Sequence, residues 1–263
     1  MKSILDFARA KRSRRPITVV TAYDFLQARL LASSSVDALL VGDSAAMVVH
    51  GHASTIHATI EMMVTHTAAV RRGAPEGFII TDLPFLATRL GRSAATQAAG
   101  QLLQAGANAV KIEGVDGHED LIPHLIGSGI PVMGHLGLTP QSVNQFGGHR
   151  VQGRSPAAAK RLRHDALLLE QLGVFALVLE CLPAALARSL TQELRVPTIG
   201  IGAGAGTDGQ VLVITDLLGL DPGFRPRFAR RYLDGARLVT RALNTFSRDV
   251  RAGRFPAPKE VIA

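Results

Sequence analysis

The sequence predicts an α/β fold, a closed (β/α)₈ TIM barrel of eight parallel strands with helical sequence between most of them. Short apolar runs alternate with helical stretches along most of the 263 residues, as repeated βαβ units require. The length suits one such barrel. Aromatic residues make up only 5% of the chain and Trp is absent, so the core must consist mainly of Ala, Val, Leu and Ile. Such residues pack well in the layered interior of a parallel barrel.

The predicted elements follow one another in the order that a barrel needs. Ser3 opens an amphipathic stretch that indicates a capped helix leading into the first strand. Gly106, Gly129 and Gly173 each stand between a helix and a strand, where a helix end favours glycine. We expect strands at Ile17 to Val20, Ala38 to Asp43, Phe78 to Asp82, Ala109 to Glu113, Val132 to His135, Ala176 to Glu180, Thr198 to Gly204 and Val211 to Ile214. We expect helices at Asp24 to Ser33, Thr59 to Arg72, Ala94 to Ala105, Glu119 to Ser128, Ser155 to Leu172, Ala184 to Leu194 and Pro226 to Arg251. No linker-like segment divides them, so we expect one domain over residues 1–263.

Five of the apolar runs end in residues that bind metals or move protons. Continuous apolar runs are typical of buried parallel strands. The carboxyl ends of such strands meet at one edge, where a closed parallel barrel carries its chemistry. The residues that this arrangement would bring together are Asp43, Ser44, Asp82, Lys111, Glu113, His135 and Glu180.

Three carboxylates at these strand ends suggest a metal site. Asp43 and Asp82 could instead cap the elements that follow them, although Asp82 is followed by a loop-like sequence. Together with Glu113 they would form an oxygen cluster suited to Mg²⁺. Without a cation the cluster would be costly, because like charges at close range repel.

The remaining strand-end residues each have two interpretations. Lys111 and Glu113 stand two positions apart on a strand and therefore face the same side. They form either a buried ion pair or part of a site. His135 is either a satisfied loop histidine or a site residue. Glu180 either faces solvent or faces the barrel mouth, where desolvation would raise its pKa toward that of a general base.

Composition and spacing argue against several other classes of protein. The net charge is +8, but the basic clusters are scattered and accompany no nucleic-acid recognition motif. No apolar stretch approaches the roughly 18 residues that a membrane span needs. Cys181 is the only cysteine, so we expect no intrachain disulfide and a reducing compartment, the cytoplasm. A glycine-rich segment from Gly204 to Gly209 resembles a dinucleotide fingerprint, but a strand rather than a helix follows it. His50, His52, His57 and His66 lack regular ligand spacing, which argues against zinc.

The ordered motifs of the chain resemble those of the ketopantoate hydroxymethyltransferase family over nearly its whole length. The matching segments are Thr21-Ala-Tyr-Asp24, Val41-Gly-Asp-Ser44, His66-Thr-Ala-Ala-Val-Arg-Arg-Gly73, Asp82-Leu-Pro-Phe85, Ala105-Gly-Ala-Asn-Ala-Val-Lys-Ile-Glu-Gly114, Gly134-His-Leu-Gly-Leu-Thr-Pro-Gln-Ser142, Leu179-Glu-Cys181, Gly200-Ile-Gly-Ala-Gly204 and Asp208-Gly-Gln210. The resemblance implies a barrel of the phosphoenolpyruvate/pyruvate superfamily that binds Mg²⁺ and forms homo-oligomers, often decamers in bacteria. It also implies transfer of a hydroxymethyl group from 5,10-methylenetetrahydrofolate to 3-methyl-2-oxobutanoate, through an enolate, giving 2-dehydropantoate for pantothenate biosynthesis.

The resemblance also implies roles for the strand-end residues. Glu180 is expected to accept the proton. The expected metal ligands are Asp43, Asp82 and Glu113, and the expected substrate-binding residues are Asp43, Ser44, Asp82, Lys111 and His135.

The chain departs from the family pattern in its loops, at Ala45-Ala46, Ala53, His57 and Leu86 to Arg89, which bears on loop order and folate affinity. Two alternatives remain. One is a lyase or aldolase of the same superfamily that acts on another 2-oxo acid without folate. The other is a non-catalytic basic binding protein.

Overall fold

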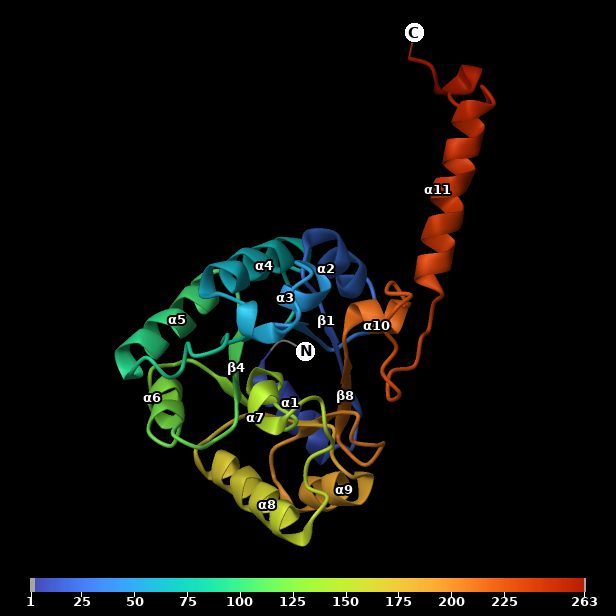
Figure 1. The fold of residues 1–263 in the computed structure, drawn as a ribbon. Helices are drawn as coiled ribbons and strands as arrows, with labels where there is room; N and C mark the ends of the chain where they lie inside the picture. The colour runs from blue at the N-terminus through green and yellow to red at the C-terminus, as the bar shows by residue number, and fades with distance from the viewer. Residues whose placement is uncertain (1–2, 263) are drawn as a thin grey trace. The chain divides into compact units, whose positions relative to one another are not determined.

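Eight parallel strands pair in sequence order and close into a barrel in the computed structural model, which describes residues 3–262 (Figure 1). Each strand pairs with the next along the chain, and the last pairs with the first, Val19 standing opposite Val211. The predicted (β/α)₈ barrel is therefore confirmed. The strands are β1 (Ile17–Thr21), β2 (Ala38–Val41), β3 (Ile79–Asp82), β4 (Ala109–Glu113), β5 (Val132–Gly137), β6 (Ala176–Glu180), β7 (Thr198–Ile201) and β8 (Gly209–Leu212).

Helices follow the strands and begin at residues that suit helix starts. Asp24 and Thr59 accept hydrogen bonds from Gln27 N and Met62 N, and Ser155 accepts one from Ala158 N. The helices of the barrel are α1 (Ile4–Arg12), α2 (Phe25–Ala32), α3 (Ala45–Val48), η1 (Thr55–His57), α4 (Ile60–Gly73), α5 (Arg92–Gln104), α6 (Leu121–Gly127), η2 (Pro140–Ser142), α7 (Val143–Phe146), α8 (Pro156–Gln171) and α9 (Ala184–Glu193). The long helices match the predicted ones to within about two residues, as helix boundaries allow. The short helices α3 and α7 were not predicted, since a single turn shows no periodicity.

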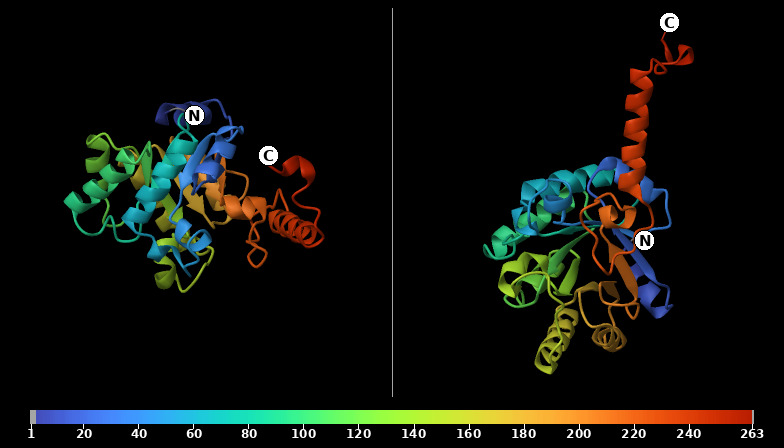
Figure 2. Two further views of the ribbon diagram at one scale, coloured as in Figure 1. Left: turned by 90° about the horizontal axis from the view of Figure 1, so that it is seen from above. Right: turned by 45° about the vertical axis from the view of Figure 1, so that its right-hand side comes forward.

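Helix α1 closes the amino-terminal end of the barrel. Its Phe7 is fully buried, and the Phe7 ring lies 5.2 Å from the rings of both Phe78 and Phe175. In the left view of Figure 2 the N-terminal helix lies at one end of the barrel, while α3 and α7 lie at the opposite end. The barrel therefore has a closed floor, and only its carboxyl-terminal mouth is available for a site.

The side-chain alternation along the strands sets which residues enter the barrel. The interior cluster includes Leu40, Ile80, Ala109, Met133 and Val178. Because side chains alternate along a strand, the residues two positions further on face inward as well. Those positions hold Asp82 after Ile80, Lys111 after Ala109, His135 after Met133 and Glu180 after Val178, and Glu113 follows Lys111 by two more positions. The interior thus changes from apolar to charged within one step of the alternation.

The contacts divide the chain after Leu212, and a second compact unit begins at Val213. It contains α10 (Ile214–Leu218), α11 (Gly235–Arg251) and η3 (Pro258–Glu260). The predictions of a strand reaching Ile214 and of a helix from Pro226 were wrong at these ends. The Arg231 guanidinium donates to the carbonyls of Asp221 and Phe224, which holds the segment before α11 in a loop. The expectation of one domain over residues 1–263 stays a prediction.

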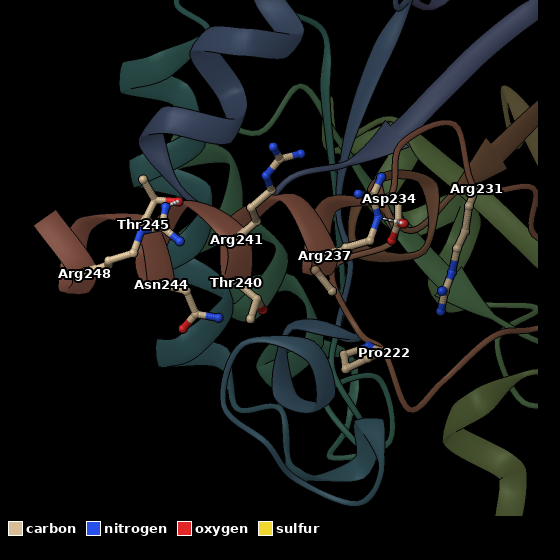
Figure 3. Close-up of a pocket in the computed structure, with 10 residues that line it drawn as sticks. Pro222, Arg231, Asp234, Arg237, Thr240, Arg241, Asn244, Thr245 and Arg248 are labelled. Atoms are coloured by element: carbon tan, nitrogen blue, oxygen red, sulfur yellow. Dashed lines mark hydrogen bonds and ion pairs between the residues drawn. The ribbon is translucent and has the colours of Figure 1, made fainter.

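The second unit carries a strongly basic surface. Arginines of α11 and of the loop before it line a hollow of about 810 Å³ (Figure 3). Within this hollow the Arg237 guanidinium donates to the Asp234 carboxylate at 2.6 Å. The apolar side of α11 is also exposed, with Leu238, Leu243 and Phe246 each more than 40% accessible. None of the predicted site residues belongs to this unit. In the part of the chain that the structure describes, none of the helices is both long and apolar enough to cross a membrane.

Candidate active site

Lys111 is the centre of the charged layer at the barrel mouth. Its Nζ lies 3.0 Å from Asp82 Oδ1, 3.8 Å from Glu113 Oε1 and 3.2 Å from His135 Nδ1. Burial lowers the pKa of Lys111, but the charges of Asp82, Glu113 and Asp43 outweigh burial and hold the pKa above its usual value. The ammonium therefore stays charged and balances part of the negative charge around it. Of the two interpretations of the Lys111–Glu113 pair, its setting among other buried charges favours a site.

The three predicted metal ligands are buried, and their pKa values are shifted differently. Burial raises the pKa of Asp43 well above its usual value, and the charges of Asp82 and Glu113 raise it further. Burial also raises the pKa of Asp82, although Lys111 opposes this effect. Burial alone would raise the pKa of Glu113, but the hydrogen bond and charge of His135 bring it below its usual value. The cluster therefore contains more negative charge than Lys111 compensates, and the effect is strongest on the pKa of Asp43.

The donor atoms of this cluster fit a hard cation by their chemistry. Asp82 Oδ1 and Glu113 Oε1 are buried, and their partners are the charged side chains of Lys111 and His135. Carboxylate oxygens are the ligands that Mg²⁺ prefers. Among residues 3–262, however, no three His, Cys, Asp or Glu side chains converge as a metal-binding group. At Asp82 the side chain of Lys111 accounts for this, since its Nζ contacts the Oδ1 atom. The assignment of Asp43, Asp82 and Glu113 as metal ligands stays a prediction.

His135 connects the carboxylate layer to Glu180. Its Nδ1 lies 3.4 Å from Glu113 Oε1, and its Nε2 lies 3.3 Å from Glu180 Oε2. Burial and Lys111 lower the pKa of His135, but the contacts with Glu113 and Glu180 outweigh them and raise it above its usual value. The side chain of Glu180 is 16% exposed, against 6% for Glu113. Glu180 is therefore the carboxylate of this pair that a molecule entering the mouth meets first.

Asp43 and Ser44 lie beside the layer, at the end of β2. The backbone N–H of Asp43 donates to Asp82 Oδ2 at 3.1 Å, and its carboxylate accepts from Gln141 Nε2 at 2.8 Å. Asp43 does not cap α3, whose N-cap residue is Ser44. The Ser44 hydroxyl is 2.8 Å from the Tyr23 hydroxyl, and burial raises the pKa of Tyr23, which keeps this phenol neutral. All seven predicted residues therefore gather at one end of the barrel.

Two residues of the site were missed by the sequence predictions. Gln141 joins three parts of the mouth, because its side chain donates to Asp43 and to the Leu83 carbonyl while its backbone N–H donates to Glu113 Oε2. Tyr23 positions Ser44, as described above. Both residues lie inside motifs on which the family resemblance rests, and that was the signal available in the sequence.

The chain is similar in sequence to proteins of known activity. A family model described as ketopantoate hydroxymethyltransferase matches residues 1–258. The chain belongs to this family. A 3-methyl-2-oxobutanoate hydroxymethyltransferase of Bdellovibrio bacteriovorus is 50% identical over 260 residues, covering 99% of both chains. The enzyme of the same name from Francisella tularensis subsp. novicida is 48% identical over 256 residues, covering 97% of both.

Solved structures of other enzymes share the fold. Phosphonopyruvate hydrolase, in a complex with oxalate and Mg²⁺, has a TM-score of 0.65 at 12% identity and covers 100% of this chain and 92% of its own. 2,3-Dimethylmalate lyase, described as a PEP mutase/isocitrate lyase superfamily member, has a TM-score of 0.62 at 19% identity with the same coverage. These structures agree with the predicted barrel fold, which is confirmed. With the hydroxymethyltransferase relatives, so is the prediction of an enzyme that transfers a hydroxymethyl group to 3-methyl-2-oxobutanoate.

Four histidines lie close together after β2, namely His50, His52, His57 and His66. The rings of His52 and His57 stack with centroids 4.8 Å apart, and His50 Nε2 is 2.8 Å from His66 Nε2. His66 Nδ1 in turn is 2.5 Å from the Tyr23 carbonyl, so it is the donor of that hydrogen bond. Of the loop positions expected to depart from the family pattern, His57 is therefore held against the ring of His52.

Proposed function

We propose that the chain transfers a hydroxymethyl group from 5,10-methylenetetrahydrofolate to 3-methyl-2-oxobutanoate, giving 2-dehydropantoate and tetrahydrofolate through an enolate. The contact between His135 and Glu180 supports this most directly. It places a partly exposed carboxylate beside a layer of buried charges that suits a 2-oxo acid and a cation. Deprotonation next to a carbonyl needs such a base within reach of the C–H bond.

Asp43, Asp82 and Glu113 are the residues that would hold Mg²⁺. When bound, the ion would polarise the keto group, acidify the adjacent C–H and stabilise the negative charge that develops on the oxygen. Lys111 and Ser44 would bind the carboxylate and oxygens of the keto acid. Lys111 suits this role because its raised pKa keeps it charged, and Ser44 suits it because Tyr23 fixes its hydroxyl.

Glu180 would remove the proton from C3 of the keto acid. The buried ring of His135 fixes the direction of the Glu180 carboxylate, since Nε2 lies 3.3 Å from Oε2. The enolate carbon would then form a bond to the one-carbon unit of the folate. Water would supply the hydroxyl oxygen of the transferred group, and both carbon–nitrogen bonds that join the one-carbon unit to the folate would break. Their electron pairs would remain on the two nitrogens, which take up the proton from C3 and one proton from the water to give tetrahydrofolate.

The substitution Glu180→Gln tests the role of the base. We expect it to abolish exchange of the C3 proton of 3-methyl-2-oxobutanoate with D₂O, because the amide cannot accept the proton. Keto-acid binding in the presence of Mg²⁺ should survive, because the amide has nearly the same size and shape. NMR follows the exchange, and calorimetry follows the binding. Exchange at the wild-type rate would remove Glu180 from this role.

A product assay with the folate donor separates the proposed reaction from its closest alternative. A lyase or aldolase of the superfamily would act on another 2-oxo acid or use a simple aldehyde, with no turnover of methylenetetrahydrofolate. Formation of 2-dehydropantoate from the folate donor would support the proposal.

A cytoplasmic homo-oligomer, with a decamer expected, is also part of the proposal. The apolar residues of α11, such as Leu243 and Phe246, support an oligomer, because they are not covered within their own unit and leave a surface that a second copy of the chain could cover. Light scattering of the purified protein measures the particle mass and tests this expectation.

A further inference from the structure

A cavity of about 460 Å³ opens next to the charged layer, and the proposed roles of the site leave most of it unused. Its lining runs from Glu113 of β4 to Asp165 of α8. The cavity also lies close to the proposed base. Gly137 in its wall packs so tightly against the strand end that a Cβ there would lie 2.1 Å from the Glu180 carbonyl oxygen. A molecule bound in this cavity would therefore have one part beside the Glu113 side chain and close to the strand end that carries Glu180.

The walls of the cavity suit a flat ring system. Leu136, Phe146 and Leu162 supply apolar surface. Gly114 leaves open space beside its backbone, since a Cβ built there would meet no atom within 4 Å. Ligand sites of this size are commonly apolar with a few placed polar groups that fix the orientation of the ligand.

Asp165 is the polar group of this cavity that packing does not explain. The residue is only 8% exposed, although His164 before it and Arg161 one turn earlier face water. Its contacts come from its own helix and are long, with Arg161 Nε at 3.4 Å and His164 Nδ1 at 3.2 Å. Both of those side chains are mostly exposed and provide weak compensation. A buried carboxylate with such partners is expensive unless a ligand supplies better donors.

Positive charge lies at the outer part of the cavity. Arg161 and Arg89 both belong to the lining and are exposed. Arg161 also contacts Asp116, itself largely exposed, so neither guanidinium is committed to a buried partner. The cavity therefore combines an acidic inner group, apolar walls and a basic rim.

We propose that this cavity binds the one-carbon donor by its reduced pterin ring, with the Asp165 carboxylate accepting hydrogen bonds from the ring N3–H and 2-amino group. Those two N–H groups are parallel and match the two oxygens of a carboxylate. The basic rim would face the anionic glutamate tail of the donor. The assignment rests on the proposed function, because it takes the folate to be the donor.

Binding of tetrahydrofolate tests this assignment, because this product binds without any transfer step. We expect Asp165→Asn to weaken tetrahydrofolate binding roughly 10- to 100-fold, the range for losing hydrogen bonds to a charged group. The matched control is Glu193→Gln, which removes one negative charge from an exposed pair with Arg163 and should bind like the wild type. Calorimetry or fluorescence quenching measures the affinity.

A second pair of variants tests the cavity by its volume. Ala158→Trp would fill the cavity from its α8 wall, whereas Ala157→Trp, one position earlier, would extend from an exposed position into solvent. We expect Ala158→Trp to lose tetrahydrofolate binding and Ala157→Trp to keep it. Exchange of the keto-acid C3 proton needs no donor, so exchange in each variant shows that the fold and the keto-acid site remain intact.

An analogue separates ring recognition from general electrostatics. Tetrahydrofolate without its 2-amino group should bind the wild type more weakly, and Asp165→Asn should weaken it little further. Wild-type affinity in Asp165→Asn, or in Ala158→Trp, would overturn the assignment of this cavity. If the wild-type protein itself neither binds tetrahydrofolate nor turns over the donor, the proposed function fails first and the assignment fails with it.

Discussion

The lower and upper halves of the barrel interior are built on the same strands and the same alternation, yet they contain opposite kinds of residue. Met133 in the lower half is followed by His135, and Ile80 is followed by Asp82. In the lower half, burial of apolar side chains is itself favourable, at about 25 cal/mol per Å². In the upper half, burial disfavours the charged form of each carboxylate. Two positions along a strand thus separate the apolar lower half, which stabilises the fold, from the charged upper half, which depends on that stability.

The two halves also differ in how their groups depend on one another. A buried apolar side chain is stabilised by any close packing, whereas each buried charge needs a specific partner. Lys111 is the example, since it contacts Asp82, Glu113 and His135 at once. Substitutions in the upper half should therefore have effects of either sign, and those in the lower half should only destabilise.

The largest effect is expected for Lys111→Met. Removing the ammonium leaves Asp82 and Glu113 buried without their cation, which costs about 3–5 kcal/mol when one partner of a buried pair is lost. Urea unfolding near neutral pH, at a fixed protein concentration, measures the loss. The control is Lys160→Met on the exposed side of α8, expected within about 0.5 kcal/mol of wild type. A loss no larger than in the control would show that Lys111 does not compensate the carboxylates.

A smaller effect of opposite sign is expected for Asp43→Asn. The raised pKa of Asp43 means that the folded state binds its proton more tightly than the unfolded state, so wild-type stability falls as the pH rises through that range. The variant lacks this loss and should be more stable by about 0.5–2 kcal/mol without metal, as is common when a strained site residue is replaced. The gain should shrink as the pH falls toward the usual pKa of an aspartate.

Thermal unfolding at several pH values, with and without Mg²⁺, checks this second expectation. Mg²⁺ should stabilise the wild type and leave Asp43→Asn unaffected. A variant less stable than the wild type at every pH would show that the Asp43 carboxylate is not destabilising where it lies.

The smallest effect is expected for Ile80→Val, which removes one methyl group from the lower half. Ile80 is fully buried, and such a change costs about 0.5–1.5 kcal/mol. Transfer activity per folded molecule should not change.

Asp82→Ala, two residues along the same strand, should instead weaken Mg²⁺ and keto-acid binding together. If Ile80→Val altered keto-acid affinity as well, the separation between the two halves would not hold.

The residues at the barrel mouth could be predicted because their position depends on local rules. Alternation along a strand puts Lys111 and Glu113 on one face, and the shared direction of parallel strands brings Asp82 and Glu180 to the same end. Neither rule needs knowledge of tertiary packing. The sequence could therefore predict which residues meet, although the structure alone supplies their distances.

Features that depend on tertiary contacts were predicted poorly. Gln141 joins Asp43 and Glu113 across 98 and 28 residues of sequence, and no periodicity marks such a residue. The helix predicted from Pro226 begins only at Gly235, because Arg231 holds the preceding loop through backbone carbonyls. Local propensity could not show that these contacts would replace helical hydrogen bonds.

The aromatic floor has a consequence for the order of folding. Phe7 reaches its packed position only when Phe78 and Phe175 are both present, so the first helix depends on residues made much later. Contacts so distant in sequence are slow to form. During synthesis, α1 must therefore remain unpacked until most of the barrel has left the ribosome. Its apolar face is the one that a nascent-chain chaperone would have to shield.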